Sequence, residues 1–218
     1  MREIGNIYLS WRKGQGMRRR IVGTIRRNAT SGVSFSYNKD EVAKAKQEGF
    51  APYTEFPEID KKYTDNVIEI FGQRITKTER SDIKDFYAFW EIDKKYSDDK
   101  YYLLAHTQGL LPTDNFEFLA NYYPVKELCF MTDLAGVAFL ALPAEMLKEG
   151  DQLSFSLERN NPHDKYAVKI FFKNQQIGYI KKVHSQVFYK RNGKNLKLIV
   201  KAVDQNGIVK RVFVKVSF

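Results

Sequence analysis

One short segment of the sequence contains side chains that can bind the end of a nucleic-acid strand. Asn160, Asn161 and Asp164 flank Pro162, which predicts a turn that presents two amides and a carboxylate on one loop. The carboxylate of Asp164 can accept a hydrogen bond from a terminal hydroxyl, and the amides can bond sugar or base edges. The alternative is an ordinary loop in which the same side chains cap their own backbone.

Lysines and aromatic residues elsewhere in the C-terminal half can supply the other contacts that a nucleic acid needs. Lys181 and Lys182 can contribute charge to phosphates, and Tyr179 or Phe139 can offer a face on which a base stacks. The candidate nucleic-acid-binding residues are therefore Phe139, Asn160, Asn161, Asp164, Lys165, Tyr179, Lys181 and Lys182.

The residue patterns do not favour catalysis, a cofactor or a metal. Gly14 and Gly16 lack the third glycine, the Lys-Ser/Thr pair and the following helix of a phosphate-binding loop, so a hairpin turn is favoured. Cys129 is the single cysteine and the three histidines are far apart in sequence, which argues against a disulfide or a zinc site. We therefore expect a protein that is not an enzyme and holds no cofactor or metal.

The net charge of +10 is segregated along the chain. Residues 11–27 hold seven Arg or Lys and no acid, and residues 159–218 hold fourteen Lys or Arg against two Asp. A basic segment that also has strand-like alternation indicates a folded surface facing a polyanion, with nucleic acid as the first expectation and an acidic protein as the second. The alternative is a solvated basic face that only aids solubility.

Length and composition favour a folded protein. Apolar residues make up 43% of the 218 residues and aromatic residues 14%, which excludes the disordered class and allows one large domain or two small ones. No run approaches the ~20 apolar residues of a membrane helix, and the first twenty residues lack the apolar segment of a signal peptide. We therefore expect a cytoplasmic protein that does not engage a membrane.

The chain is predicted to begin as a β-meander. Its three β-branched and aromatic runs, separated by glycine-containing turns, are residues 7–11, 21–27 and 33–37. Trp11 precedes the basic turn that holds Arg18, Arg19 and Arg20. If exposed, Trp11 can stack on a base or fill a pocket of a partner, so these four residues are candidates for binding a partner or a polyanion.

Residues 38–120 are predicted to be mainly helical. Thr76 and Glu79 have the spacing of a capping box. One apolar helical face follows, formed by Ile83, Phe86, Tyr87 and Trp90. We expect this stripe, including Trp90, to belong to the core, and we place the domain boundary at residues 121–127, where composition and charge change.

The remainder is predicted to be mostly strand and to close a small barrel. The runs of strand length are residues 153–159, 167–172, 177–180, 196–203 and 209–218. Residues 184–190 are long enough only for a short helix, and Asn192-Gly193 predicts a tight turn.

The segment LERNNPHDKYAVKIFFKNQQIGYIKK, residues 157–182, resembles the core motif of the HIRAN domain, in which Asn-Pro-x-Asp-x-x-Ala-Val precedes a hairpin and Ile-Gly-Tyr. Ala135-Gly136-Val137 and Gly150-Asp151 match the family's first strand and a turn, so the resemblance covers residues 125–218. It implies a small β-barrel with appended helices. It also implies binding of the 3′ end of single-stranded DNA, as in the chromatin-remodelling helicases that carry this domain.

The sequence departs from the DNA-binding members of that family at two positions. Ala138 stands in place of an Arg that precedes the aromatic residues, and His163 stands in place of the usual Tyr. Loss of a bidentate phosphate ligand and of one stacking ring predicts weaker capture of a 3′ end, while general polyanion binding is unaffected.

The first domain resembles a different family. IYLSWRKGQGMRRRIVGTIRRNATSGVSFSY, residues 7–37, looks like the N-terminal subdomain of HipA-type kinases, and residues 68–92 and 103–118 extend the match in the family's order. Nothing past residue 120 resembles the kinase lobe, its phosphate loop or its metal-binding Asp. The resemblance therefore implies a subunit that binds a separately encoded HipA-type kinase, as the antitoxin of split systems does.

Together these inferences predict a two-domain α+β binding protein, with a HipA-like domain at residues 1–122 and a HIRAN domain at residues 125–218. The first hypothesis is a toxin-antitoxin or defence module in which residues 1–120 dock on the kinase and the HIRAN domain contacts nucleic acid. The alternative is an independent single-stranded DNA or 3′-end binder in DNA repair or phage defence.

Overall fold

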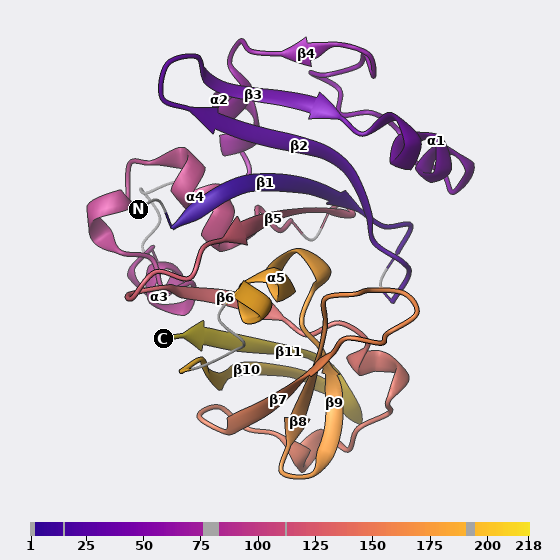
Figure 1. Cartoon of the computed structure of the whole chain (residues 1–218), viewed down its shortest axis with the longest axis vertical. Helices are drawn as coiled ribbons and strands as arrows, with labels where there is room; N and C mark the ends of the chain where they lie inside the picture. The colour runs from indigo at the N-terminus through magenta and orange to yellow at the C-terminus, as the bar shows by residue number, and fades with distance from the viewer. Residues whose placement is uncertain (1–2, 15, 76–82, 112, 191–194) are drawn as a thin grey trace. The chain divides into compact units, whose positions relative to one another are not determined.

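The computed structural model describes residues 3–14, 16–75, 83–111, 113–190 and 195–218. The chain divides into an N-terminal unit, Ile4–Asn121, and a C-terminal unit, Tyr122–Phe218 together with Glu3. Each unit has its own sheet. In Figure 1 the N-terminal unit runs from indigo to magenta and the C-terminal unit continues through orange to yellow.

The N-terminal unit is built on a five-stranded sheet with the order β4-β3-β2-β1-β5 (Figure 1). Its strands are β1 (Ile4–Trp11), β2 (Arg20–Asn28), β3 (Gly32–Tyr37), β4 (Lys62–Tyr63) and β5 (Phe116–Tyr122). The first three strands pair antiparallel in chain order, which confirms the meander predicted for residues 7–37. Ile25 and Phe35 lie opposite each other and are fully buried, because alternate strand positions share one face of the sheet.

Short helices with side-chain caps accompany this sheet. They are α1 (Lys39–Gln47), α2 (Val67–Gly72), α3 (Ile83–Phe89) and α4 (Lys100–Thr107), together with the 3₁₀ turn η1 (Lys94–Tyr96). The Oδ1 atom of Asn38 accepts a hydrogen bond from the Glu41 amide at 3.3 Å and so starts α1. Asp99 caps α4 in the same way through the amides of Tyr101 and Tyr102. Each cap satisfies amides that lack an intrahelical partner.

The helical prediction for residues 38–120 holds only in part. The helix α3 carries the predicted stripe, but its Ile83, Phe86 and Tyr87 are only half-buried. The expectation that the stripe belongs to the core therefore holds only for Trp90, just beyond the helix, which is buried. The capping-box pair Thr76 and Glu79 lies outside the described residues. β5 is a strand instead of a helix. Its residues 117–120 are all buried, so the polar-apolar alternation that identifies a half-buried strand is missing there.

The core of the N-terminal unit is a cluster of aromatic rings. Phe35 of β3 lies with its ring centroid 5.2 Å from those of both Phe56 and Phe71, and Phe71 lies 5.0 Å from Phe118 of β5. All four rings are almost completely buried. Such pairs add about 0.5–1.5 kcal/mol each beyond the burial of their area, so this cluster fixes α2 against the sheet.

The C-terminal unit contains a six-stranded antiparallel sheet with the order β6-β11-β10-β7-β8-β9. Its strands are β6 (Cys129–Asp133), β7 (Gln152–Glu158), β8 (Ala167–Phe172), β9 (Gln175–Tyr179), β10 (Lys197–Asn206) and β11 (Ile208–Ser217). The strands predicted from residue 153 onward are confirmed. Among the described strands, β6 and β9 remain the two edges of the sheet, so the regular strand pairing does not close the predicted barrel. A single isolated bridge, between Ala135 and Tyr179, joins the segment after β6 to the end of β9.

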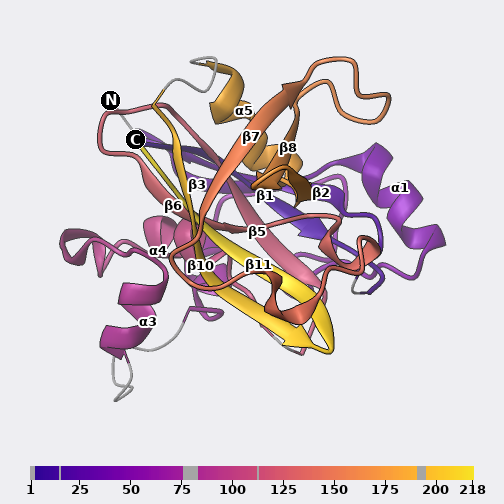
Figure 2. The same cartoon turned by 90° about the horizontal axis from the view of Figure 1, so that it is seen from below.

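One helix and two 3₁₀ turns complete this unit. They are η2 (Val137–Phe139), η3 (Ala144–Met146) and α5 (Lys182–Lys190). The predicted short helix is α5, which lies beside β7 and β8 (Figure 2). Its Phe188 ring meets Phe155 of β7 edge to face at 5.0 Å, and the Tyr189 hydroxyl donates to the Ala167 carbonyl at 2.8 Å. The predicted turn at Asn192-Gly193 lies outside the described residues.

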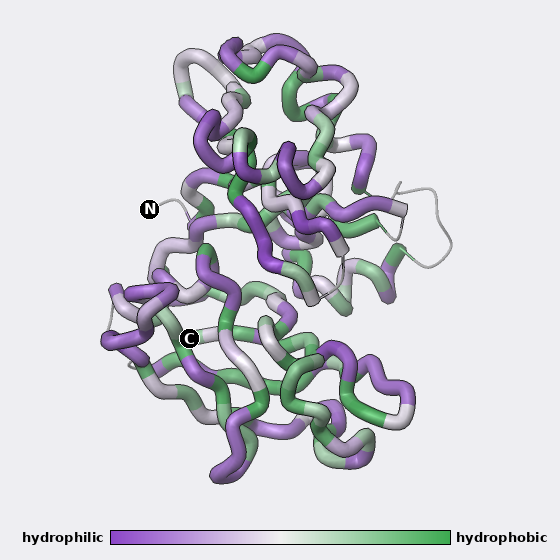
Figure 3. Tube along the Cα trace, turned by 90° about the vertical axis from the view of Figure 1, so that its right-hand side faces the viewer, coloured by the Kyte–Doolittle hydropathy of each residue, from purple (hydrophilic) through white to green (hydrophobic). Residues whose placement is uncertain are grey.

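Hydrophobic and hydrophilic residues are interleaved along the chain in both units (Figure 3). In β11 the side chains of Val212, Val214 and Val216 are fully buried, whereas Arg211 and Lys215 are partly exposed. This alternation places one strand face on a core and the other toward solvent. Among the described helices, none has the length and apolar character needed to cross a bilayer.

Candidate nucleic-acid interface

The glycine of the Ile-Gly-Tyr segment allows two backbones to meet. Ala135 and Tyr179 exchange two hydrogen bonds, at 2.8 Å and 2.9 Å. Gly178 has φ +149°, and a Cβ atom there would lie 2.8 Å from the Ala135 carbonyl oxygen. A side chain at this position would therefore force the bridge apart. The bridge sets Tyr179 next to the turn that begins at Gly136.

That turn directs one aromatic side chain outward. Gly136 has φ +80° and precedes the 3₁₀ turn η2, so Ala135-Gly136-Val137 is not the strand that the family resemblance implied. Val137 is buried, while Phe139 is 77% exposed, more than any other large hydrophobic side chain among the described residues. An exposed ring beside polar groups is a suitable stacking face for a base.

The Asn-Pro-x-Asp loop uses part of its polar chemistry on itself. Asn161 accepts from the amides of His163 and Asp164 at 2.9 Å and 3.0 Å, and its own amide donates to Glu158 at 2.8 Å. Oδ1 of Asp164 accepts from the Tyr166 amide at 3.0 Å. These are the backbone caps that the structural alternative predicted. Asn161 is therefore a loop-building residue.

Two groups of the same loop remain open to a ligand. Asn160 is exposed, and neither its side chain nor Oδ2 of Asp164 makes a hydrogen bond with the described part of the protein. Asp164 is half-buried, so the backbone contact at Oδ1 holds the carboxylate in place while Oδ2 can still accept. The loop thus presents the exposed amide of Asn160 and a carboxylate oxygen of Asp164 that the backbone contact holds in place.

Glu158 connects this loop to the sheet, and sequence reasoning missed it. Its carboxylate forms an ion pair with Lys169 at 2.6 Å, and Lys169 lies opposite Tyr179 in the β8-β9 register. Hydrogen bonds from Lys169 and Asn161 lower the pKa of Glu158. The charge of this glutamate, which would repel a phosphate, is therefore matched by Lys169. No local motif marks the pair, because their contact spans two strands.

The prediction that Lys181 contacts a phosphate is wrong. Its side chain is almost fully buried, and its ammonium group pairs with the buried carboxylate of Asp133, which also accepts from Arg211 at 3.0 Å. Lys182, the first residue of α5, is exposed. Of the two neighbouring lysines, only Lys182 has the exposure that a phosphate contact requires.

Cations lie over aromatic rings next to the loop. Lys165 is exposed, with its ammonium nitrogen 5.0 Å from the centroid of Tyr166, and Arg159 lies 5.5 Å from the centroid of Tyr189. The two tyrosine rings meet edge to face at 5.3 Å. Arg159, an exposed cation, was missed because the sequence pattern did not connect it with α5. The arrangement keeps positive charge and ring surface together, as single-strand binding sites do.

In the N-terminal unit, Trp11 is a core residue. It is 7% exposed and packs edge to face on Phe50 at a centroid distance of 5.5 Å. The prediction that Trp11 contacts a partner is therefore corrected, because its ring has no free face in this fold.

Two of the three arginines in the basic turn are engaged inside the N-terminal unit. Arg19 makes two hydrogen bonds to the buried carboxylate of Glu117, at 2.8 Å and 3.1 Å. Arg20 pairs with Glu48. Arg18 is exposed and makes no ion pair with a described residue. Of the three arginines, only Arg18 therefore has a charge that is available to a partner or polyanion, as predicted for all three.

Comparison with known proteins identifies part of the C-terminal unit. Residues 128–207 match the family model of the HIRAN domain, so the chain contains a HIRAN domain over this range. The crystal structure of the HIRAN domain of human HLTF is similar to 40% of this chain and 74% of its own chain, with 18% sequence identity and a TM-score of 0.33. No curated protein matches the sequence.

The matched range excludes the N-terminal unit, so the resemblance of residues 1–122 to the HipA subdomain stays a prediction. Within the residues that the structure describes, no cluster of three or more His, Cys, Asp or Glu side chains could hold a metal ion.

Proposed function

We propose that the C-terminal unit binds single-stranded nucleic acid, with the 3′ end of single-stranded DNA as its first ligand, and that the protein acts by binding rather than by catalysis. Two findings support this: residues 128–207 match the HIRAN domain, and Phe139 is exposed in the turn η2 that follows the bridge between Ala135 and Tyr179. The exposure of Phe139 is the observation that carries the proposal, since a core role does not account for it.

Each open group has a distinct part in the proposed contact. Phe139 stacks on a base, and Oδ2 of Asp164 accepts a hydrogen bond from a terminal hydroxyl while Asn160 bonds a sugar or base edge. Lys165 and Lys182 contribute charge to the phosphates. Asn161 and Glu158 hold the loop in position without touching the strand.

The chemistry at position 138 limits the expected affinity. Ala138 is exposed in the turn beside Phe139 and offers no guanidinium to clamp a phosphate in two-point fashion. We therefore expect binding that depends on stacking and on dispersed charge, with a modest preference for a free 3′-hydroxyl.

Fluorescence anisotropy tests this proposal directly. The full chain is titrated into labelled single strands of about ten nucleotides that carry a 3′-hydroxyl or a 3′-phosphate, with duplex as the control, at about 0.05 M and about 0.2 M salt. We expect tighter binding to the single strand and a preference for the hydroxyl end. Equal affinity for both ends would remove the 3′-end assignment, and no binding at low salt would overturn the proposal.

A series at Phe139 separates stacking from other effects. Phe139→Tyr keeps a ring and should keep the affinity, whereas Phe139→Leu keeps an apolar side chain without a ring. The loss of one stacked base is worth about 1–3 kcal/mol, so the leucine variant should bind about 5- to 150-fold more weakly. Equal affinities for all three proteins would show that the ring is not a contact.

Docking of the N-terminal unit on a separately encoded HipA-type kinase is a second proposal. It is supported by the order of β1, β2 and β3, which follows the pattern of the resemblance, and by the exposed Arg18. Mixing the chain with such a kinase should shift the elution volume of the kinase or change its phosphorylation rate. If both stay unchanged, the docking proposal fails.

A further inference from the structure

The outward face of β2, β3 and β4 carries a row of polar side chains that no function above uses. The register pairs Thr24 with Ser36, Arg26 with Ser34, and Ser36 with Lys62. Residues opposite each other in an antiparallel pair share one face. All five side chains therefore lie on the face opposite the buried aromatic cluster of the N-terminal unit.

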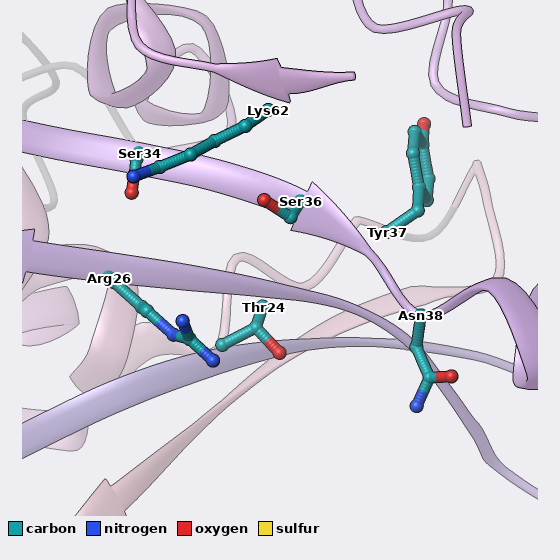
Figure 4. A pocket seen from close by; sticks show the side chains of 7 residues that line it. All are labelled: Thr24, Arg26, Ser34, Ser36, Tyr37, Asn38 and Lys62. Carbon is teal, nitrogen blue, oxygen red and sulfur yellow. The ribbon is translucent and has the colours of Figure 1, made fainter. Parts of the chain in front are cut away.

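These side chains line a hollow of about 310 Å³. In Figure 4 the Lys62 side chain extends from β4 toward Ser34, and the Arg26 guanidinium extends toward Thr24, so that both cations and the hydroxyls surround one space. The hollow lies on regular strands, which hold its lining residues at fixed spacing.

Both cations of the hollow retain their charge for a ligand. Arg26 and Lys62 are exposed, and neither forms an ion pair with any residue in the described ranges. The residues that line the hollow include these two cations and no acid, and two nearby acids are paired elsewhere, Asp60 with Lys39 and Glu58 with Lys61 at 3.3 Å. The local field in the hollow is therefore positive.

The chemistry of the lining fits a phosphodiester. Arg and Lys together with Ser and Thr hydroxyls are the side chains that proteins use on phosphate oxygens. Tyr8 of β1 lies opposite Thr24 in the register and so stands on the same face, half-buried. A ring next to a phosphate site allows a neighbouring base to stack, which an acidic peptide would not use.

We propose that the outward face of β2, β3 and β4 binds the phosphodiester backbone of a single-stranded nucleic acid through Arg26, Lys62 and the hydroxyls between them. The inference rests on the proposed nucleic-acid function and extends it to the N-terminal unit. It requires no particular placement of the two units, because each unit can contact a different stretch of one strand or a different strand.

Site-resolved NMR separates this inference from the proposed function. The full chain, labelled with ¹⁵N, is titrated with a single strand of about ten thymidines. If the inference is correct, the amide signals of Thr24, Arg26 and Ser34 shift together. Shifts confined to the amides of Gly136 and Phe139 would overturn the inference and leave the proposed function intact. Shifts at neither place would overturn both.

Charge removal supplies the second arm of the test. Arg26→Gln with Lys62→Gln should abolish the shifts on β2 and β3, and should lower the slope of log affinity against log salt by about 1.4, which corresponds to two phosphates on a single strand. At about 0.15 M salt this is a loss of about tenfold in affinity. The matched control is Lys84→Gln with Lys94→Gln, which removes two exposed charges of the same unit from α3 and η1.

A peptide of ten glutamates tests the alternative that this face binds an acidic protein. If this peptide shifts the amides of Thr24 and Ser34 at lower concentration than the oligonucleotide does, the face is an acidic-protein site and the inference is wrong. An equal loss of affinity in the control variant would show only general attraction, and would also contradict a built phosphate site.

Discussion

Lys181 and Asp133 form an ion pair in which the side chains are 1% and 3% exposed. Arg211 adds a second cation at 3.0 Å from the same carboxylate. The pair joins Lys181, the second residue after the Ile-Gly-Tyr segment, to Asp133, the last residue of β6. It therefore connects the two edge strands of the sheet close to the Ala135-Tyr179 bridge.

Removal of the acid from this pair should be strongly destabilising. Asp133→Ala leaves the ammonium group of Lys181 buried without its counter-charge, which costs about 3–5 kcal/mol in comparable cases. Urea unfolding of the full chain measures the change in the free energy of unfolding. Lys182→Ala removes a neighbouring exposed charge and should change that free energy by less than about 0.5 kcal/mol. Similar effects of both variants would contradict the buried pairing.

Gly178→Ala should open the bridge between Ala135 and Tyr179. The new Cβ atom meets the Ala135 carbonyl oxygen at 2.8 Å, in a backbone conformation that disfavours side chains. We expect a loss of about 1–3 kcal/mol and faster hydrogen exchange at the amides of Ala135 and Tyr179. Gly14→Ala, where a Cβ atom meets nothing within 4 Å, is the control. Unchanged exchange in Gly178→Ala would show that the bridge tolerates a side chain.

His106 should make the stability of the N-terminal unit depend on pH. Burial lowers the pKa of His106 to about 3, whereas an unfolded histidine titrates near 6.5. Between these values the unfolded chain binds the extra proton, so stability is complete above about pH 6.5 and falls as the pH drops, by about 1.4 kcal/mol per unit.

The matched variant for this effect is His106→Phe, since the imidazole stacks on Tyr102 at a centroid distance of 4.0 Å. Between about pH 7 and about pH 5, the wild-type chain should lose about 2 kcal/mol more stability than the variant. Carboxylates and the other histidines titrate in both proteins and cancel. Parallel stability curves would show that His106 accepts a proton in the folded state.

Neighbouring residues of the Asn-Pro-x-Asp loop should respond differently to mutation. Asp164→Asn keeps an oxygen for the Tyr166 amide and loses the negative charge at Oδ2. It should therefore fold normally and lose the preference for a 3′-hydroxyl over a 3′-phosphate. Asn161→Ala removes the contacts to His163, Asp164 and Glu158 and should lower the unfolding free energy by about 1–2 kcal/mol. A retained end preference in Asp164→Asn would remove Asp164 from the interface.

Strands in which polar and apolar residues alternate could be predicted from the sequence, and strands without this alternation could not. β1 to β3 and the strands after residue 153 carry alternating or β-branched runs, and the structure has them. β5 was missed because Glu117 is buried by pairing with arginine, so a charged residue there did not mark a solvent face. The prediction that Lys181 contacts phosphate was wrong for the same reason. Its burial depends on an ion pair with Asp133, which is far away in the sequence. Phe139 was identified as a candidate, although only the turn at Gly136 explains its exposure.

The pairing of arginines inside the N-terminal unit changes how its basic segment acts at a distance. Of the seven cations in residues 11–27, four are paired with four carboxylates: Arg12 and Arg19 share Glu117, Arg20 contacts both Glu41 and Glu48, and Arg27 pairs with Asp99. The three that make no ion pair with the described residues are Lys13, Arg18 and Arg26. A paired charge acts as a dipole, whose field decays well within the Debye length of about 8 Å at physiological salt. Long-range steering of a polyanion toward this segment therefore depends on three charges rather than seven.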